Sequence, residues 1–139
     1  MKKEIPNDIV AEQSVLGSMF LSKYALQKAI ESLNTDSFYL DKHGKIFDSI
    51  KSLFNKGVAV DLTTLTGELK DKNILDEIGG VKYLTEILEI TPTAANIDYY
   101  VQIVEDKSIL RNLIEETTEI ASLAYSNEYS LNETLDKAE

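Results

Sequence analysis

Residues 96–125 read NIDYYVQIVEDKSILRNLIEETTEIASLAY and predict one long α-helix. Asn96 is a good N-cap, and Asp98 places a carboxylate in the first turn, where the helix dipole favours an anion. A helix of about 28 residues is more than twice the mean length in globular proteins. We therefore expect this helix to leave its own globule and to pack against a partner helix.

The long helix is amphipathic, and a second helix follows it. Its apolar face consists of Ile103, Leu110, Leu113, Ile114, Ile120, Ala121 and Ala124. After a turn at residues 126–129, Ser130 and Glu133 have the spacing of a capping box that opens another helix through Leu131 and Leu135. The chain stops at Glu139 about two turns into that helix. We therefore expect a helical hairpin over residues 93–139, truncated in its second arm, from a longer protein.

Helix patterns also fill the residues before the hairpin. They predict helices over 9–20 with Asn7 as cap, 24–33 after Ser22, 41–55 with Gly57 as a stop, 62–69 after Asp61, and 81–88 after the glycines at 79–80. Gly17, inside the first helix, indicates a close contact with another helix. The sequence thus predicts an all-α fold, with a globular subdomain over residues 1–92 ahead of the hairpin.

Composition excludes several classes of protein. The 139 residues are 43% hydrophobic and 27% charged, which is typical of one globular domain. The sequence contains no cysteine, and this excludes disulfides, zinc knuckles and thiol nucleophiles. No apolar run approaches the ~20 residues of a membrane span, and residues 1–8 lack the apolar stretch of a secretory signal. We expect a cytoplasmic protein that binds no membrane.

The charge of the chain is unevenly distributed. Residues 1–70 carry nine lysines and nine acids, whereas residues 71–139 carry five basic residues and fifteen acids. The whole net charge of -10 therefore belongs to the second half. Such a surface repels phosphate, since nucleic-acid binding depends on cationic contacts. The pattern favours a protein partner over direct binding of nucleic acid.

Signals for catalysis are sparse. His43 is the sole histidine, and we interpret it as a structural or surface residue rather than a catalytic one. The one Gly-Lys pair, Gly44-Lys45, precedes Ile46 and does not form a phosphate-binding loop. We expect no catalytic, metal-binding or cofactor-binding residues in this chain, and no ATP hydrolysis by it alone.

Two other classes of function stay open. Residues 61–83 contain two short helices with a turn, the arrangement of a DNA-binding helix-turn-helix, although Lys82 is outnumbered by Glu86 and Glu89 in the second helix region. A small hydrolase would have to use His43 with a carboxylate.

Several segments, in order, resemble the N-terminal domain of bacterial replicative DNA helicases of the DnaB family. The resemblance extends from Ile5 to Glu139. It rests on AEQSVLG (11–17) after Pro6, DSFY (36–39) with His43 and IF (46–47), VDLTTL (60–65) with Leu69, GGVKYL (79–84), PTAANI (92–97) with YY (99–100), IVEDKS (103–108), and LDKAE (135–139). Gly44, Gly67 and Ala59 depart from the family pattern, and the family's ATPase part with its P-loop has no counterpart here.

The resemblance implies the function of an assembly domain. In that family such domains pair through their hairpins, form a collar of three dimers on the hexameric motor, and hold the C-terminal domain of primase; a helicase loader is a possible further partner. The positions that match the family's primase contacts are Tyr83, Ile114 and Ile120. The apolar face formed by Ile103, Leu110, Leu113, Ala121 and Ala124 is the expected dimer face. ATP and magnesium would belong to the full-length helicase.

Overall fold

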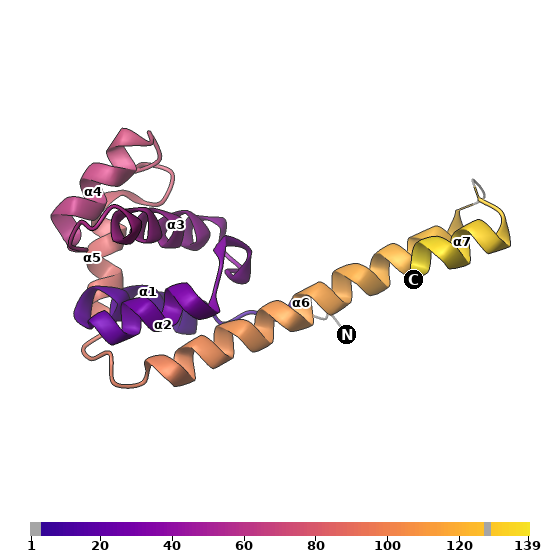
Figure 1. Ribbon diagram of the computed structural model, residues 1–139, viewed down its shortest axis with the longest axis horizontal. Helices are drawn as coiled ribbons and strands as arrows, with labels where there is room; N and C mark the ends of the chain where they lie inside the picture. The colour runs from indigo at the N-terminus through magenta and orange to yellow at the C-terminus, as the bar shows by residue number, and fades with distance from the viewer. Residues whose placement is uncertain (1–3, 127–128) are drawn as a thin grey trace. The chain divides into compact units, whose positions relative to one another are not determined.

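The structure, a computed structural model, describes residues 4–126 and 129–139. All regular structure in those residues is helical, with no strand. The elements are α1 (Ile9–Leu21), α2 (Lys23–Ser32), the short 3-10 helix η1 (Thr35–Ser37), α3 (Asp41–Asn55), α4 (Leu62–Asp71), α5 (Gly80–Ile90), α6 (Ile97–Tyr125) and α7 (Leu131–Ala138) (Figure 1). The predicted all-α fold class is confirmed.

Short polar side chains fix where three of the helices begin. Ser22 accepts a hydrogen bond from the Ala25 backbone N–H at 3.2 Å, and Asp61 accepts one from Thr64 at 2.8 Å. Ser130 accepts one from the Glu133 backbone N–H. Each bond satisfies a donor that the first turn of a helix otherwise leaves open. The caps predicted at Asp61 and Ser130 are confirmed, and Ser22, which precedes the helix predicted over 24–33, also acts as a cap.

The predicted cap of α1 is wrong by one residue. Asp8 rather than Asn7 is the N-cap, and its Oδ1 accepts a hydrogen bond from the Ala11 backbone N–H at 2.9 Å. Both residue types are good caps, and the choice depends on the spacing of three residues from cap oxygen to backbone donor. The sequence offers two adjacent candidates, and the backbone path selects the second.

The chain forms two compact units, and the first comprises Asn7–Ser108. Within it α1 packs against α2, α3 and α5, while α3 also packs against α4 and η1 (Figure 1). The core is apolar and draws on every α-helix of this unit. Its largest fully buried apolar side chains are Leu16, Met19, Ile46, Phe47, Ile50, Leu65, Leu69, Ile78, Leu84, Ile87 and Ile97.

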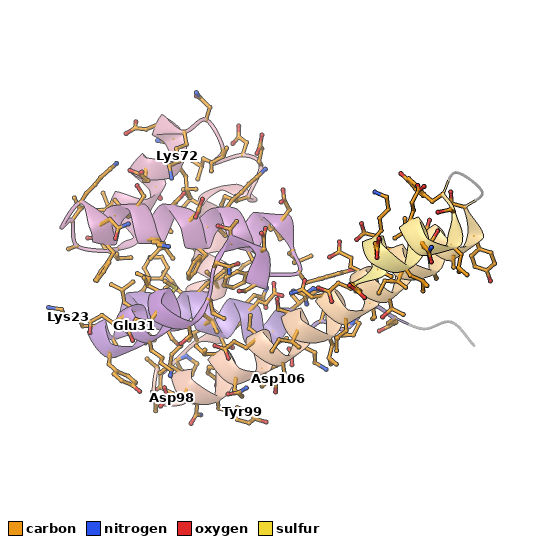
Figure 2. The ribbon with its side chains drawn as sticks, turned by 45° about the vertical axis from the view of Figure 1, so that its right-hand side comes forward. Lys23, Glu31, Lys72, Asp98, Tyr99 and Asp106 are labelled. Carbon is orange, nitrogen blue, oxygen red and sulfur yellow. The ribbon has the colours of Figure 1, made fainter. Side chains whose placement is uncertain are left out.

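The first turns of α6 belong to this globular unit. Ile97, Val101 and Val104 recur on one side of the helix and are buried in the core. Tyr24 of α2 donates a hydrogen bond to Asp98 at 2.9 Å, and Asp98, labelled in Figure 2, lies in the first turn of α6. Because of these contacts, the first turns of α6 belong to the compact unit that ends at Ser108. The division into subdomains between residues 92 and 93 stays a prediction.

Among the described residues, the second unit comprises residues 4–6 and the segment from Ile109 to Glu139, without 127–128. In it α7 lies alongside the end of α6 (Figure 1), and side chains of both helices line one hollow that includes Ile120, Leu123 and Ala138. Arg111 also donates a hydrogen bond to the Pro6 carbonyl at 3.0 Å. The expected helical hairpin is therefore present. The turn predicted at 126–129 includes residues 127–128, which lie outside the described residues.

In the described part of the chain, no helix is both long enough and apolar enough to span a bilayer. Residues 1–3, which belong to the stretch searched for a secretory signal, lie outside the described residues.

Candidate functional site

Three polar side chains from three different helices meet inside the globular unit. Glu12 of α1 and His43 of α3 are 1% and 0% exposed, and the Glu12 carboxylate lies 2.8 Å from Nδ1 of His43. The other ring nitrogen, Nε2, lies 2.5 Å from the hydroxyl of Tyr83 on α5. The chain Glu12–His43–Tyr83, which we call the polar network, therefore links α1, α3 and α5 through the core.

The buried end of this network is fully hydrogen-bonded. The Glu12 carboxylate also accepts hydrogen bonds from the backbone N–H groups of Tyr39, at 2.7 Å, and Leu40, at 3.4 Å. A buried carboxylate is costly unless several donors surround it. In the tautomer of neutral histidine that carries its proton on Nδ1, this N–H donates to the Glu12 carboxylate. With a neutral ring, Nε2 then accepts the hydrogen bond of the Tyr83 hydroxyl.

Tyr83 lies at the outer end of the network and is half-buried. Its ring stacks with that of His43 at an angle of 15°, and Gln13 donates a hydrogen bond to its hydroxyl at 3.1 Å. A Cβ atom at Gly79 would lie 2.7 Å from the Cβ of Tyr83, so the glycine leaves the space that this side chain needs. Nζ of Lys42 lies 3.7 Å from the centroid of the Tyr83 ring, within the range of a cation–π interaction.

The other two residues that match primase contacts lie in the second unit. Ile114 is 47% exposed and Ile120 is 44% exposed, both on α6. Neither belongs to the core, so both side chains are available for a contact with another protein. Tyr83 differs from them, because its hydroxyl is hydrogen-bonded to His43 inside the globular unit.

The expected dimer face is partly solvent-exposed. Leu110 and Leu113 are 44% and 54% exposed, and Ala121 and Ala124 are also exposed. Ile103 is half-buried because it packs against the core of the globular unit. Leu131 and Leu135 of α7 add further exposed apolar side chains to the second unit.

Sequence reasoning missed the link between Glu12, His43 and Tyr83, although each stands in a segment that carries the family resemblance. A usable signal was present, because Glu12 lies among the apolar residues 9–20 and His43 lies one turn before the buried Phe47. A polar residue on an apolar helical face needs a partner. The sequence does not show which residues are close in space: Glu12 and Tyr83 are 31 and 40 positions from His43 along the chain.

The geometry of His43 bears on the hydrolase alternative. Both ring nitrogens are within hydrogen-bond distance of protein groups and the residue has no exposed surface. A general base must reach a proton on a bound substrate. His43 therefore fits the structural role that the sequence favoured. In the residues that the structure describes, no three acidic or histidine side chains gather in a way that would hold a metal ion.

The described residues thus define an all-α domain with a polar network in its globular unit and a helical hairpin that exposes apolar side chains. The chain belongs to the family of DnaB-like helicase N-terminal domains, because the model of that family matches residues 4–106. It corresponds to the N-terminal domain of the replicative helicases in this family.

Individual relatives agree with this assignment. Over 134 residues the chain is 48% identical to the replicative DNA helicase DnaC of Bacillus subtilis and 46% identical to the replicative DNA helicase DnaB of Geobacillus stearothermophilus. Each alignment covers 96% of this chain and 30% of the relative. The chain therefore spans under a third of the length of these helicases.

Solved structures share the fold. The N-terminal domain of DnaB helicase from Mycobacterium tuberculosis superposes with a TM-score of 0.91 at 38% identity, over 97% of this chain and 95% of that one. The N-terminal domain of DnaB helicase from Helicobacter pylori, described together with its interactions with primase, gives a TM-score of 0.72 at 24% identity, over 84% of this chain and 91% of that one. At that identity the likeness extends to the fold alone.

Proposed function

We propose that this chain is the assembly and primase-binding domain of a hexameric replicative DNA helicase. The observation that carries the proposal is the set of exposed apolar side chains on α6 and α7, in a family whose full-length members named above are replicative helicases. Its members are Leu110, Leu113, Ile114, Ile120, Leu131 and Leu135. Exposed apolar side chains that form a contiguous patch mark a protein interface.

The proposed assembly has two parts. A second protomer covers the hairpin face, and three such pairs form a ring in the full-length protein. Primase binds through Tyr83, Ile114 and Ile120, and a helicase loader is a further candidate partner. The excess of acids in residues 71–139 supports protein partners over DNA for this domain. The full-length helicase, a cytoplasmic enzyme, would use ATP and magnesium outside the residues present here.

Isothermal titration calorimetry against the C-terminal domain of primase from the same organism tests this function. We expect saturable binding with a negative heat-capacity change, because apolar surface is buried. Light scattering on the same sample reports whether the protomers are paired. Absence of heat from a paired sample would overturn primase recruitment. Absence of pairing in the full-length helicase after Leu113→Asp, but not after Ser122→Asp, would support the dimer face.

DNA binding is the second candidate function, and α4 and α5 would supply its helix-turn-helix. Gly79, the last residue of their joining segment, and Gly80, the first residue of α5, both have positive φ. On α5, however, Lys82 stands with Glu86 and Glu89, which disfavours contact with phosphates. A salt-sensitive gel shift with duplex DNA would support this alternative over the assembly domain.

A further inference from the structure

Lys42 is a cation without a carboxylate partner among the described residues, and its ammonium lies over the ring of Tyr83. Its Nζ lies 3.7 Å from the centroid of the Tyr83 ring, and none of the ion pairs between described residues includes it. Lys45, one turn further along α3, lies 3.2 Å from Asp41 and 2.8 Å from Glu77. Of these two neighbouring lysines, one is neutralised and the other is held over an aromatic ring.

The Tyr83 ring under Lys42 is anchored at both ends, by its hydroxyl and by its Cβ. The Tyr83 hydroxyl is hydrogen-bonded to His43 and Gln13, and the Cβ end of the side chain occupies the space beside Gly79. The carboxylate beneath the network, Glu12, is committed to His43 and to two backbone N–H groups. Glu12 therefore does not neutralise Lys42.

An ammonium over an aromatic ring keeps N–H donors that point away from the ring face. The best partner for such donors is a carboxylate, because a hydrogen bond between opposite charges is shorter and stronger than a neutral one. Holding the ammonium in place in advance reduces the side-chain entropy that a surface ion pair otherwise costs.

We propose that Lys42 and Tyr83 form a pre-positioned contact for a carboxylate of the bound partner, with Glu12 and His43 as positioning residues. This rests on the proposed binding of primase and specifies the chemistry of the primase residue that meets this surface. The net charge of -10 repels an acidic partner at long range. The attraction between Lys42 and a carboxylate therefore acts only at short range. A carboxylate at Lys42 therefore contributes to the orientation of the complex more than to its rate of formation.

The test compares substitutions at the two neighbouring lysines. Lys42→Met and Lys45→Met each remove one positive charge, whereas Lys42→Arg keeps it. Calorimetry with the primase C-terminal domain is run on the unaltered chain and on Lys42→Met, Lys42→Arg and Lys45→Met. We expect Lys42→Met to weaken binding about threefold to tenfold, Lys42→Arg to retain most of the affinity, and Lys45→Met to change it by less than about twofold. Lys42→Met should also reduce the dependence of affinity on sodium chloride.

A double-mutant cycle tests the positioning role. Tyr83→Phe removes only the hydroxyl that anchors the ring, and it should weaken binding in the unaltered chain but much less in Lys42→Met. A merely structural role for the hydroxyl would give the same loss in both backgrounds and would overturn the assignment of positioning residues. Measurements are made at a temperature at which circular dichroism shows every variant folded.

The remaining outcomes separate this contact from the function on which it rests. Equal losses for Lys42→Met and Lys45→Met would overturn the contact, because net charge alone would then explain both. An equal loss for Lys42→Arg and Lys42→Met would overturn the carboxylate chemistry. No saturable heat from the unaltered, paired chain would overturn primase binding itself, and the contact with it.

Discussion

The rings of His43 and Tyr83 stack at 15° with their centroids 5.8 Å apart, and this pair joins α3 to α5. With Glu12 behind His43, the stack connects three helices through one line of hydrogen bonds. Each of these residues lies in a different segment that carries the family resemblance. Three of the segments that carry the resemblance therefore meet at this network.

Removal of the Tyr83 hydroxyl should destabilise the fold. Tyr83→Phe leaves Nε2 of the buried His43 without its partner, and we expect a loss of about 1–3 kcal/mol of unfolding free energy. Urea denaturation measures it as a lower midpoint with an unchanged slope. Tyr24→Phe is the matched control, since Tyr24 is 58% exposed and its hydroxyl bonds Asp98 at the surface. Equal losses for the two variants would contradict a special role of the network.

Two glycines in helices should respond to alanine in opposite directions. A Cβ at Gly17 would lie 2.6 Å from the Cβ of Thr91 and 3.1 Å from the carbonyl oxygen of Ile87, so α1 would have to move away from α5. We expect Gly17→Ala to lower the unfolding free energy by about 1–3 kcal/mol. Gly67→Ala in α4 meets no atom within 4 Å and should raise it by about 1 kcal/mol. Thermal melts of both variants give the comparison, and a stabilised Gly17→Ala would contradict the close packing.

Acid should weaken the contact between α3 and α4 through Glu68. Hydrogen bonds from Lys56 and Ser52 lower the pKa of the Glu68 carboxyl, against a smaller opposing effect of burial. Because the folded-state pKa is depressed, this stabilisation is present above the ordinary glutamate pKa of about 4.3 and is lost as the pH falls through the folded-state value. Thermal melts from pH 7 to pH 3 should therefore show Glu68→Gln less stable at neutral pH, with the difference shrinking in acid. A constant difference across this range would disprove the linkage.

A charge on the hairpin should block primase without unfolding the domain. Ile120 is 44% exposed, so Ile120→Asp should leave the helical circular dichroism spectrum unchanged and abolish binding of the primase C-terminal domain. Ser122→Asp places the same charge on an exposed position two residues away and should bind nearly as the unaltered chain does. An unfolded Ile120→Asp variant would show that Ile120 has a core role instead.

Local structure could be predicted from the sequence to within a few residues. The predicted helix over 41–55 coincides with α3, and the φ of 73° at Gly57 agrees with its expected role as a stop. The close helix contact expected at Gly17 is confirmed by its packing against Thr91. These features depend on caps, glycine and periodicity, which act over a few residues. The error at Asn7 has the same scale, because adjacent residues competed for one cap.

The sequence by itself determined the all-α fold class, the long helix and the family resemblance, since each depends on residue types at short or ordered spacings. Only the tertiary structure decided that Glu12, His43 and Tyr83 form one network, and that Lys42 lies over Tyr83 while Lys45 is paired with Asp41 and Glu77. The physical reason is that burial and charge pairing depend on which faces of separate helices come within a few ångströms. Helical periodicity defines those faces, but packing chooses which of them meet.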